Sequence, residues 1–273
     1  MQADRLEGIY HEQIGTGIPI LCLHGFTLNH YSLKNALEPI FETSSSWCRH
    51  YIDLPGMGQS HPKNKVLTSD DMLGVLLAYI DIYIPTGSFV LCGHSYGGYL
   101  ARAVAHLMPE RIKGMLLIAP VIDPLERRTA LRHFSCSDTE YLTTIEPDLL
   151  KQMKEQLGVI SKTTAKRYRD EVWDAQAMKD DESLKELREN GYLLTITIDD
   201  STIPSYPIHA ILGEYDSVVG VQDTIDILQQ WPAATWSVVQ GTGHYPQLEK
   251  RENFISESRK LIYKVENIFK HEL

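Results

Sequence analysis

The stretch VLCGHSYGGYLA, Val90 to Ala101, decides the fold, because a buried strand and a helix meet at its serine. The residues GSFVLCGHS form the continuous apolar run of a buried strand, and GGYLARAVAHLMPERI has apolar residues at helical spacing. Ser95 stands between them in the pattern Gly-x-Ser-x-Gly. A turn this sharp forces a positive φ on the serine, and the glycines let strand and helix approach closely. The hydroxyl is then exposed beside the first N–H groups of the helix.

Further apolar segments alternate with helix-length amphipathic segments along most of the chain. The other strand candidates are IPILCLHGF, WCRHYI, GMLLIAPV, PIHAILGEYD and ATWSVVQGTGH. Continuous apolar strands that alternate with helices indicate an α/β fold, with a mostly parallel central sheet and helices on both faces. The spacing of apolar residues in NFISESRKLIYKVENIFKHEL predicts a covering helix at the C-terminal end.

The segment 123–204 departs from this pattern. It is highly charged and mostly helical in its spacing, and it separates two strand candidates that would otherwise follow one another. We interpret it as an inserted helical cap, which leaves residues 1–122 and 205–273 as the α/β core. Within the segment, YLLTITIDD at 192–200 is rich in β-branched residues and fits either a strand or a distorted helix.

Composition and charge exclude several classes of function. A formal net charge of −10 argues against a nucleic-acid partner or an anionic membrane surface, since both need a basic face. None of the cysteines (Cys22, Cys48, Cys92 and Cys136) belongs to a C-x-x-C pair, so we expect free thiols and no metal site. The stretch MQADRLEGIYHEQ has no apolar signal core, and no apolar run reaches about 18 residues. We therefore expect a cytoplasmic protein without membrane insertion; its oligomeric state is not predicted.

The Ser95 turn allows two interpretations. It is either a tight turn with an unreactive serine or the site of a nucleophile. A serine hydroxyl is a poor nucleophile until a base removes its proton, so the second interpretation requires a histidine and an acid elsewhere. His244 follows the last strand candidate and Asp216 follows the one before it. Loops after parallel strands emerge at one edge of the sheet, so we expect both residues near Ser95.

Other candidates for the base and the acid remain open. Asp123 also follows a strand and could reach the same histidine, and Glu214 is a third choice for the acid. His94 is next to Ser95, but neighbouring side chains at a strand end point apart, so we expect it to pack beneath the turn.

With these residues in place, the chain resembles the cap-bearing, esterase-like branch of the α/β-hydrolase superfamily. The segments HGF (His24–Phe26), DLPGMGQS (Asp53–Ser60), GHSYGG, GEYDSVV and GTGHYPQLEKRENF carry the resemblance. It implies Ser95 as nucleophile, His244 as general base and acid, and Asp216 as the orienting carboxylate.

The resemblance assigns further roles by position. It implies an oxyanion hole built from the backbone N–H groups of Phe26 and Tyr96, and His24 stands in the loop that supplies the first of these. Asp53 is expected to shape its turn, and Glu249 looks like a loop anchor. Serine in the turn argues against the dehalogenases and epoxide hydrolases of this branch, in which aspartate attacks.

The leading hypothesis is a serine esterase that cleaves a small ester or related acyl compound through an acyl-enzyme, without metal or organic cofactor. The same three residues would serve a carbon–carbon bond hydrolase or a lyase, and a non-catalytic signalling protein that binds a ligand or partner is a further alternative. Cap aromatics that could line the substrate pocket, or equally form the core of the cap, are Phe134, Tyr141, Tyr168 and Trp173.

Overall fold

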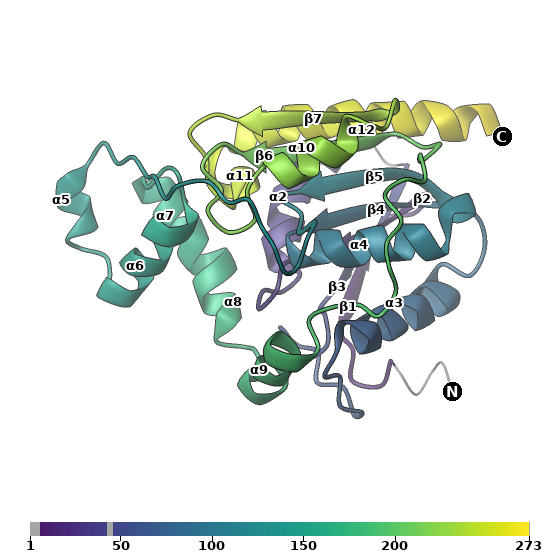
Figure 1. Cartoon of the computed structure of the whole chain (residues 1–273), viewed down its shortest axis with the longest axis horizontal. Coiled ribbons are helices and arrows are strands. Elements are labelled where there is room, and N and C mark those ends of the chain that lie inside the picture. The colour runs from purple at the N-terminus through teal and green to yellow at the C-terminus, as the bar shows by residue number, and fades with distance from the viewer. Residues whose placement is uncertain (1–5, 43–45, 273) are drawn as a thin grey trace.

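A mostly parallel sheet of 7 strands forms the centre of the computed structural model, which describes residues 6–42 and 46–272 (Figure 1). The strands are ordered β1-β3-β2-β4-β5-β6-β7, and β1 alone of these pairs antiparallel, with β3. Their bounds are β1 His11–Ile14, β2 Ile18–Leu23, β3 Trp47–Ile52, β4 Phe89–His94, β5 Ile112–Ile118, β6 Ile208–Gly213 and β7 Ala234–Val239. The predicted fold class is confirmed, although the short edge strand β1 was not among the strand candidates.

Helices cover both faces of the sheet because its central strands are apolar on both. In β4, Val90 and Cys92 pack into one buried cluster and Leu91 into the other, as the two-residue period of a strand requires. Helices α3, α4 and α10 complete the cluster on one face, and α2 and α12 the cluster on the other. The helices of these two layers are α2 Tyr31–Phe41, α3 Ser69–Tyr83, α4 Tyr96–Leu107, α10 Gln222–Leu228 and α12 Arg251–Glu272, with the short helices Pro109–Arg111 (3₁₀) and α11 Pro246–Glu249 between elements.

A helical region is inserted between β5 and β6, as predicted. It comprises α5 Thr139–Leu142, α6 Pro147–Gln156, α7 Lys162–Tyr168, a π-helical turn Arg169–Trp173, α8 Asp174–Gln176 and α9 Asp181–Asn190. Figure 1 shows α5 to α8 projecting to one side of the sheet. The boundaries 123 and 204 of the cap, and its separation from the core at 1–122 and 205–273, stay predictions. Residues 1–5 and 273, at the two ends of that core, lie outside the described residues.

Residues 192–200 form neither of the two structures considered for them. They are an irregular segment whose backbone donors bond to side chains of the core instead of a neighbouring strand. The amide of Leu194 donates to the Tyr99 hydroxyl at 3.1 Å, and the amide of Thr195 donates to the Asp70 carboxylate at 3.1 Å. Ile196 and Ile198 pack against the core. The apolar residues of this segment thus pack against the core, and side chains accept the hydrogen bonds that a neighbouring strand would accept in a sheet.

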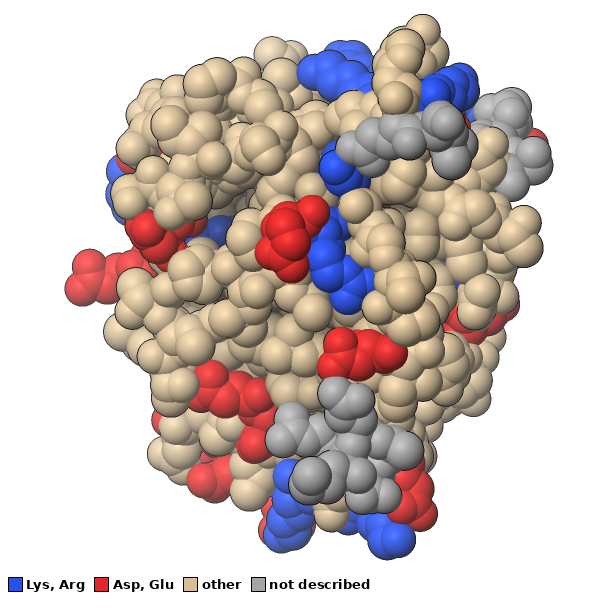
Figure 2. Space-filling view, turned by 90° about the vertical axis from the view of Figure 1, so that its right-hand side faces the viewer, with Lys and Arg blue, Asp and Glu red and all other residues tan. Residues whose placement is uncertain are grey.

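The surface and the thiols agree with an ordinary globular protein. On the face seen in Figure 2, basic and acidic side chains are interspersed in small groups. The four cysteines are free, and Cys22, Cys48 and Cys92 are buried. Within residues 6–42 and 46–272, the helices lack either the length or the apolar character that crossing a bilayer requires.

Candidate active site

Ser95 occupies a strained turn between β4 and α4. Its φ of 53° and ψ of −117° lie outside the regions that most residues adopt, as the sequence predicted. Its amide donates to Ile118 O at 2.9 Å, and its carbonyl accepts from Gly98 N and Val121 N at 2.9 and 3.0 Å, which holds the turn in place. Gly97 has to be glycine here, because a Cβ would lie 2.0 Å from the carbonyl oxygen of Leu23.

Ser95, His244 and Asp216 form a continuous chain of hydrogen bonds at the carboxyl edge of the sheet. His244 Nε2 lies 3.0 Å from Ser95 Oγ, and His244 Nδ1 lies 2.8 Å from Asp216 Oδ2. All three residues are buried, with Ser95 the most accessible at 8% exposed. The ionised carboxylate only accepts, so it fixes the hydrogen of the imidazole on Nδ1 and leaves the Nε2 lone pair facing the serine hydroxyl.

The second oxygen of Asp216 fixes the carboxylate in this orientation. Asp216 Oδ1 accepts the amides of Val218 and Val219 at 2.8 and 2.9 Å. The other acids considered for this place are engaged elsewhere. Asp123 is exposed and accepts the amides of Leu125 and Glu126, at the start of the inserted region. Glu214 accepts the amide of Gly241 at 2.7 Å.

Two other histidines near the turn, His94 and His24, make structural contacts. His94 packs beneath it, with Nε2 donating to the carbonyl oxygen of His244 at 3.2 Å and the two rings 5.0 Å apart. Its ring is fully buried, which holds its pKa well below the usual value and keeps it neutral. His24 Nδ1 donates to Gly25 O at 2.8 Å and its Nε2 accepts the amide of Leu54 at 2.9 Å, so it ties its loop to the segment after β3.

The backbone N–H groups of Phe26 and Tyr96 are free to serve as donors. Within the part of the chain that the structure describes, neither donates a hydrogen bond to another residue. Thr27 follows Phe26 with a φ of 67°, and its amide points to Met57 Sδ at 3.3 Å. The Phe26 ring packs edge-to-face on the Tyr96 ring, with centroids 5.4 Å apart.

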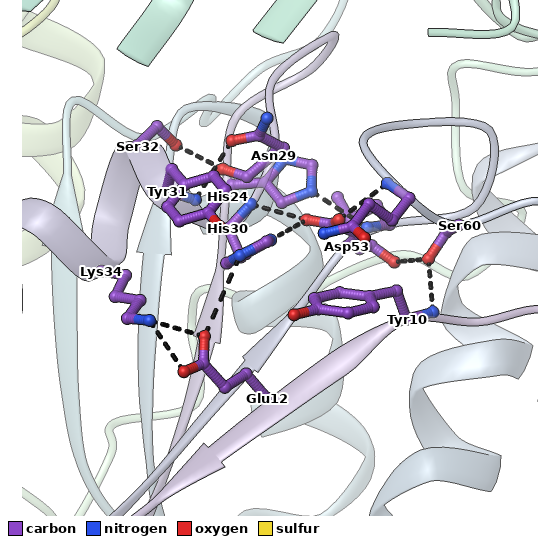
Figure 3. Close-up of polar contacts among 12 residues, drawn as sticks. Tyr10, Glu12, His24, Asn29, His30, Tyr31, Ser32, Lys34, Asp53 and Ser60 are labelled. Atoms are coloured by element: carbon purple, nitrogen blue, oxygen red, sulfur yellow. Dashed lines mark hydrogen bonds and ion pairs between the residues drawn. The ribbon is translucent and has the colours of Figure 1, made fainter. Parts of the chain in front are cut away.

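A polar network that the sequence did not predict holds the loop 24–30 at its His30 end (Figure 3). Asp53 Oδ1 accepts both the amide and Nδ1 of His30, at 2.6 and 2.8 Å, while Oδ2 accepts the amide of Gln59 at 2.8 Å. Burial raises the pKa of Asp53, but the hydrogen bonds from His30 and from the Gln59 amide outweigh this effect and keep that pKa below its usual value. Asp53 thus braces its own turn, as expected, and also the loop 24–30. No spacing in the sequence pairs it with His30.

The predicted pocket aromatics pack into the interior of the inserted region. Tyr168 is fully buried, donates its hydroxyl to Gln156 Oε1 at 2.5 Å and meets the ring of Tyr245 at 5.6 Å. The other three are partly buried against the same apolar cluster, which also includes Leu28 and Leu248 of the core: Phe134, Tyr141 and Trp173. Tyr168 therefore lies against Tyr245, the residue after His244. A role of the four aromatic residues in binding substrate stays a prediction.

Comparison with known proteins places this chain in a family. A model of the alpha/beta hydrolase fold family matches residues 18–251. The pimeloyl-[acyl-carrier protein] methyl ester esterase of Shewanella oneidensis is 30% identical over 185 residues, which are 66% of this chain and only 60% of that protein. The enzyme of the same name from Serratia marcescens is 26% identical over 92% of this chain and 96% of that protein.

A solved structure shares nearly the whole architecture. The alpha/beta superfamily hydrolase from Oenococcus oeni PSU-1 superimposes with a TM-score of 0.83 at 26% identity, over 95% of this chain and 97% of that one. The family match covers strands β2 to β7, the serine turn and the loops that carry Asp216 and His244. The chain belongs to the alpha/beta hydrolase fold family.

Proposed function

We propose that the protein is a serine hydrolase that cleaves a small carboxylic ester, or a related acyl compound, through an acyl-enzyme on Ser95. The observation that carries this proposal is the chain of hydrogen bonds from Asp216 through His244 to Ser95, at 2.8 and 3.0 Å. It joins an acid, a base and a hydroxyl in the arrangement that activates a serine.

In the acylation step, His244 Nε2 removes the hydroxyl proton as Ser95 Oγ attacks the ester carbonyl carbon. The carbonyl oxygen becomes an oxyanion, for which the N–H groups of Phe26 and Tyr96 are the proposed donors. Asp216 stabilises the imidazolium that forms. Collapse of the intermediate breaks the bond to the alkoxy group, which leaves as the alcohol with the proton from His244.

Water then repeats the sequence on the acyl-enzyme. His244 removes a proton from water, the resulting hydroxide adds to the acyl carbon, and Ser95 Oγ leaves with that proton. The carboxylic acid is released and the serine is restored. Each step uses the same base and the same pair of backbone donors, so no further reacting group is required.

The names of the relatives support esters of small alcohols as the substrate class. Both are called methyl ester esterases, and the Serratia marcescens protein matches along nearly its full length. We therefore extend the proposal to methyl and ethyl esters of acyl chains, with the inserted region as the part that selects the acyl group. A panel of esters graded by acyl length tests this extension.

Turnover of p-nitrophenyl acetate by the wild type and by Ser95→Ala tests the reaction itself. We expect hydrolysis by the wild type and its loss in the variant. Turnover of a diketone orders of magnitude faster than that of any ester would instead identify a carbon–carbon bond hydrolase on the same residues. A wild type that turns over none of these substrates and binds a ligand tightly would favour the signalling alternative.

A further inference from the structure

The loop that carries His244 is bonded along its length to the inserted region. The amide of His244 donates to Gln156 O at 2.7 Å, at the end of α6. Arg167 Nη1 on α7 donates to the carbonyl oxygens of Gln247 and Leu248 at 3.2 and 2.9 Å. The two backbones approach so closely that a Cβ on Gly243 would lie 2.3 Å from Gln156 O. The inserted region therefore supports this loop directly.

Glu249 joins the two backbones through one carboxylate. It lies on α11 and is 8% exposed. Its Oε2 accepts the amides of Gly158 and Val159 in the inserted region, at 2.7 and 2.8 Å. Its Oε1 accepts the amide of Gly243, the residue before His244, at 2.8 Å. One oxygen thus holds the inserted region and the other holds the His244 loop.

The same segment of the inserted region also reaches the loop that carries Asp216. Ser217 Oγ donates to Glu155 O at 2.6 Å. Residues 155–159 therefore contact both loops that form the acid–base pair, the Asp216 loop through Glu155 and the His244 loop through Gln156 and Glu249. A shift of this segment would change the position of His244 relative to Asp216.

We propose that Glu249 is a positioning residue, which couples residues 155–159 of the inserted region to His244 and so keeps Nε2 aligned with Ser95. This inference rests on the proposed function. It assigns the inserted region a part in the alignment of the base, in addition to the choice of substrate.

A carboxylate suits this bridge because both of its oxygens must accept. Glutamine has the same shape, but its amide nitrogen would face either the two N–H groups of the inserted region or that of Gly243. Glu214 offers a matched control, since it lies on the neighbouring loop and its Oε2 accepts only the amide of Gly241, at 2.7 Å. Glutamine can accept that single hydrogen bond with its amide oxygen.

The charge of Glu249 sets the conditions of the test. Burial raises the pKa of the Glu249 carboxyl to about 8, against the opposing effect of the backbone N–H groups that bond to it. Measurements at pH 9 therefore compare the ionised carboxylate with a neutral amide. The readout is labelling of Ser95 by a fluorophosphonate, with its rate constant and its final stoichiometry measured separately.

We expect Glu249→Gln to reach one label per chain with a rate constant about 10- to 100-fold lower, as for the loss of hydrogen bonds to a charged group. Glu214→Gln should stay within about threefold of the wild type. The inference is overturned if Glu249→Gln is labelled with the wild-type rate constant, whatever its final stoichiometry. A reduced stoichiometry at the wild-type rate constant would indicate only that some of the protein is not folded.

Glu249→Asp provides a second variant if the glutamine variant does not fold. It keeps the charge, but it is one methylene too short to reach both backbones, so slow labelling to full stoichiometry is again expected. Labelling at the wild-type rate overturns the inference. If the wild type itself takes up no label while folded, the proposed function fails first, which separates that outcome from a failure of the Glu249 inference.

Discussion

Replacing Asp216 by asparagine should remove the base function of His244 while keeping the shape of the site. Asp216 Oδ1 accepts the amides of Val218 and Val219, and these donors need an oxygen in the variant as well. The carboxamide nitrogen therefore turns toward His244 Nδ1 and donates to it. The imidazole hydrogen then moves to Nε2, which lies 3.0 Å from Ser95 Oγ and can no longer accept the serine proton.

The expected loss follows from this change of tautomer. A serine hydrolase whose imidazole carries its hydrogen on the wrong nitrogen loses about 10⁴-fold in kcat, or about 5.4 kcal/mol of transition-state stabilisation. The assay is the steady-state hydrolysis of p-nitrophenyl acetate by Asp216→Asn and, as the matched control, by Asp123→Asn. The control should behave as the wild type, because Asp123 is exposed and bonds to the amides of Leu125 and Glu126.

Two results would refute this reasoning. If Asp216→Asn kept its kcat within about tenfold, the carboxylate would not set the tautomer of His244. If Asp123→Asn showed the deep loss instead, the acid would come from the start of the inserted region, and the inserted region would have to rearrange in solution. Circular dichroism and thermal unfolding of both variants confirm that the comparison is made on folded protein.

Three further predictions concern neighbouring features. His94→Gln should slow fluorophosphonate labelling by less than about tenfold, because its ring only donates to the carbonyl oxygen of His244; a loss as deep as that of His244→Ala would contradict this. Gly97→Ala should lower the free energy of unfolding in urea by about 3 kcal/mol or more, since its Cβ would lie 2.0 Å from Leu23 O; a wild-type value would contradict the close approach. Burial lowers the pKa of His209 from 6.5 to about 4, so its contribution to stability is present above pH 6.5 and is lost as the pH falls toward 4. Between pH 7 and pH 5 the free energy of unfolding should therefore fall by about 2 kcal/mol less in His209→Asn than in the wild type, and equal slopes would contradict the assignment.

Much of the fold was predictable because its strongest signals are local. Strands such as Phe89–His94 are continuous apolar runs, and each is followed by a polar loop or a helical pattern. The edge strand His11–Ile14 carries no such signal, since it is only 4 residues long and is half-exposed. Residues 192–200 were misleading for the opposite reason, because their β-branched pattern has no partner strand, and only Ile196 and Ile198 of that pattern pack, partly buried, against the core.

The site shows the same division between local and distant information. The Ser95 turn is visible in five residues, and chain order points to His244 and Asp216. The contacts that hold these residues in place join distant parts of the chain, such as Glu249 with Gly158 and Asp53 with His30. They depend on how the inserted region and the loops pack, which neither spacing nor periodicity records.

The most direct test of the central proposal is the mass of the protein after reaction with a fluorophosphonate. If Ser95 is a nucleophile activated by His244, the wild type gains one label, peptide mapping places it on Ser95, and both Ser95→Ala and His244→Ala remain unlabelled under the same conditions. A label that persists in Ser95→Ala, or a folded wild type that gains none, would contradict the proposed serine hydrolase.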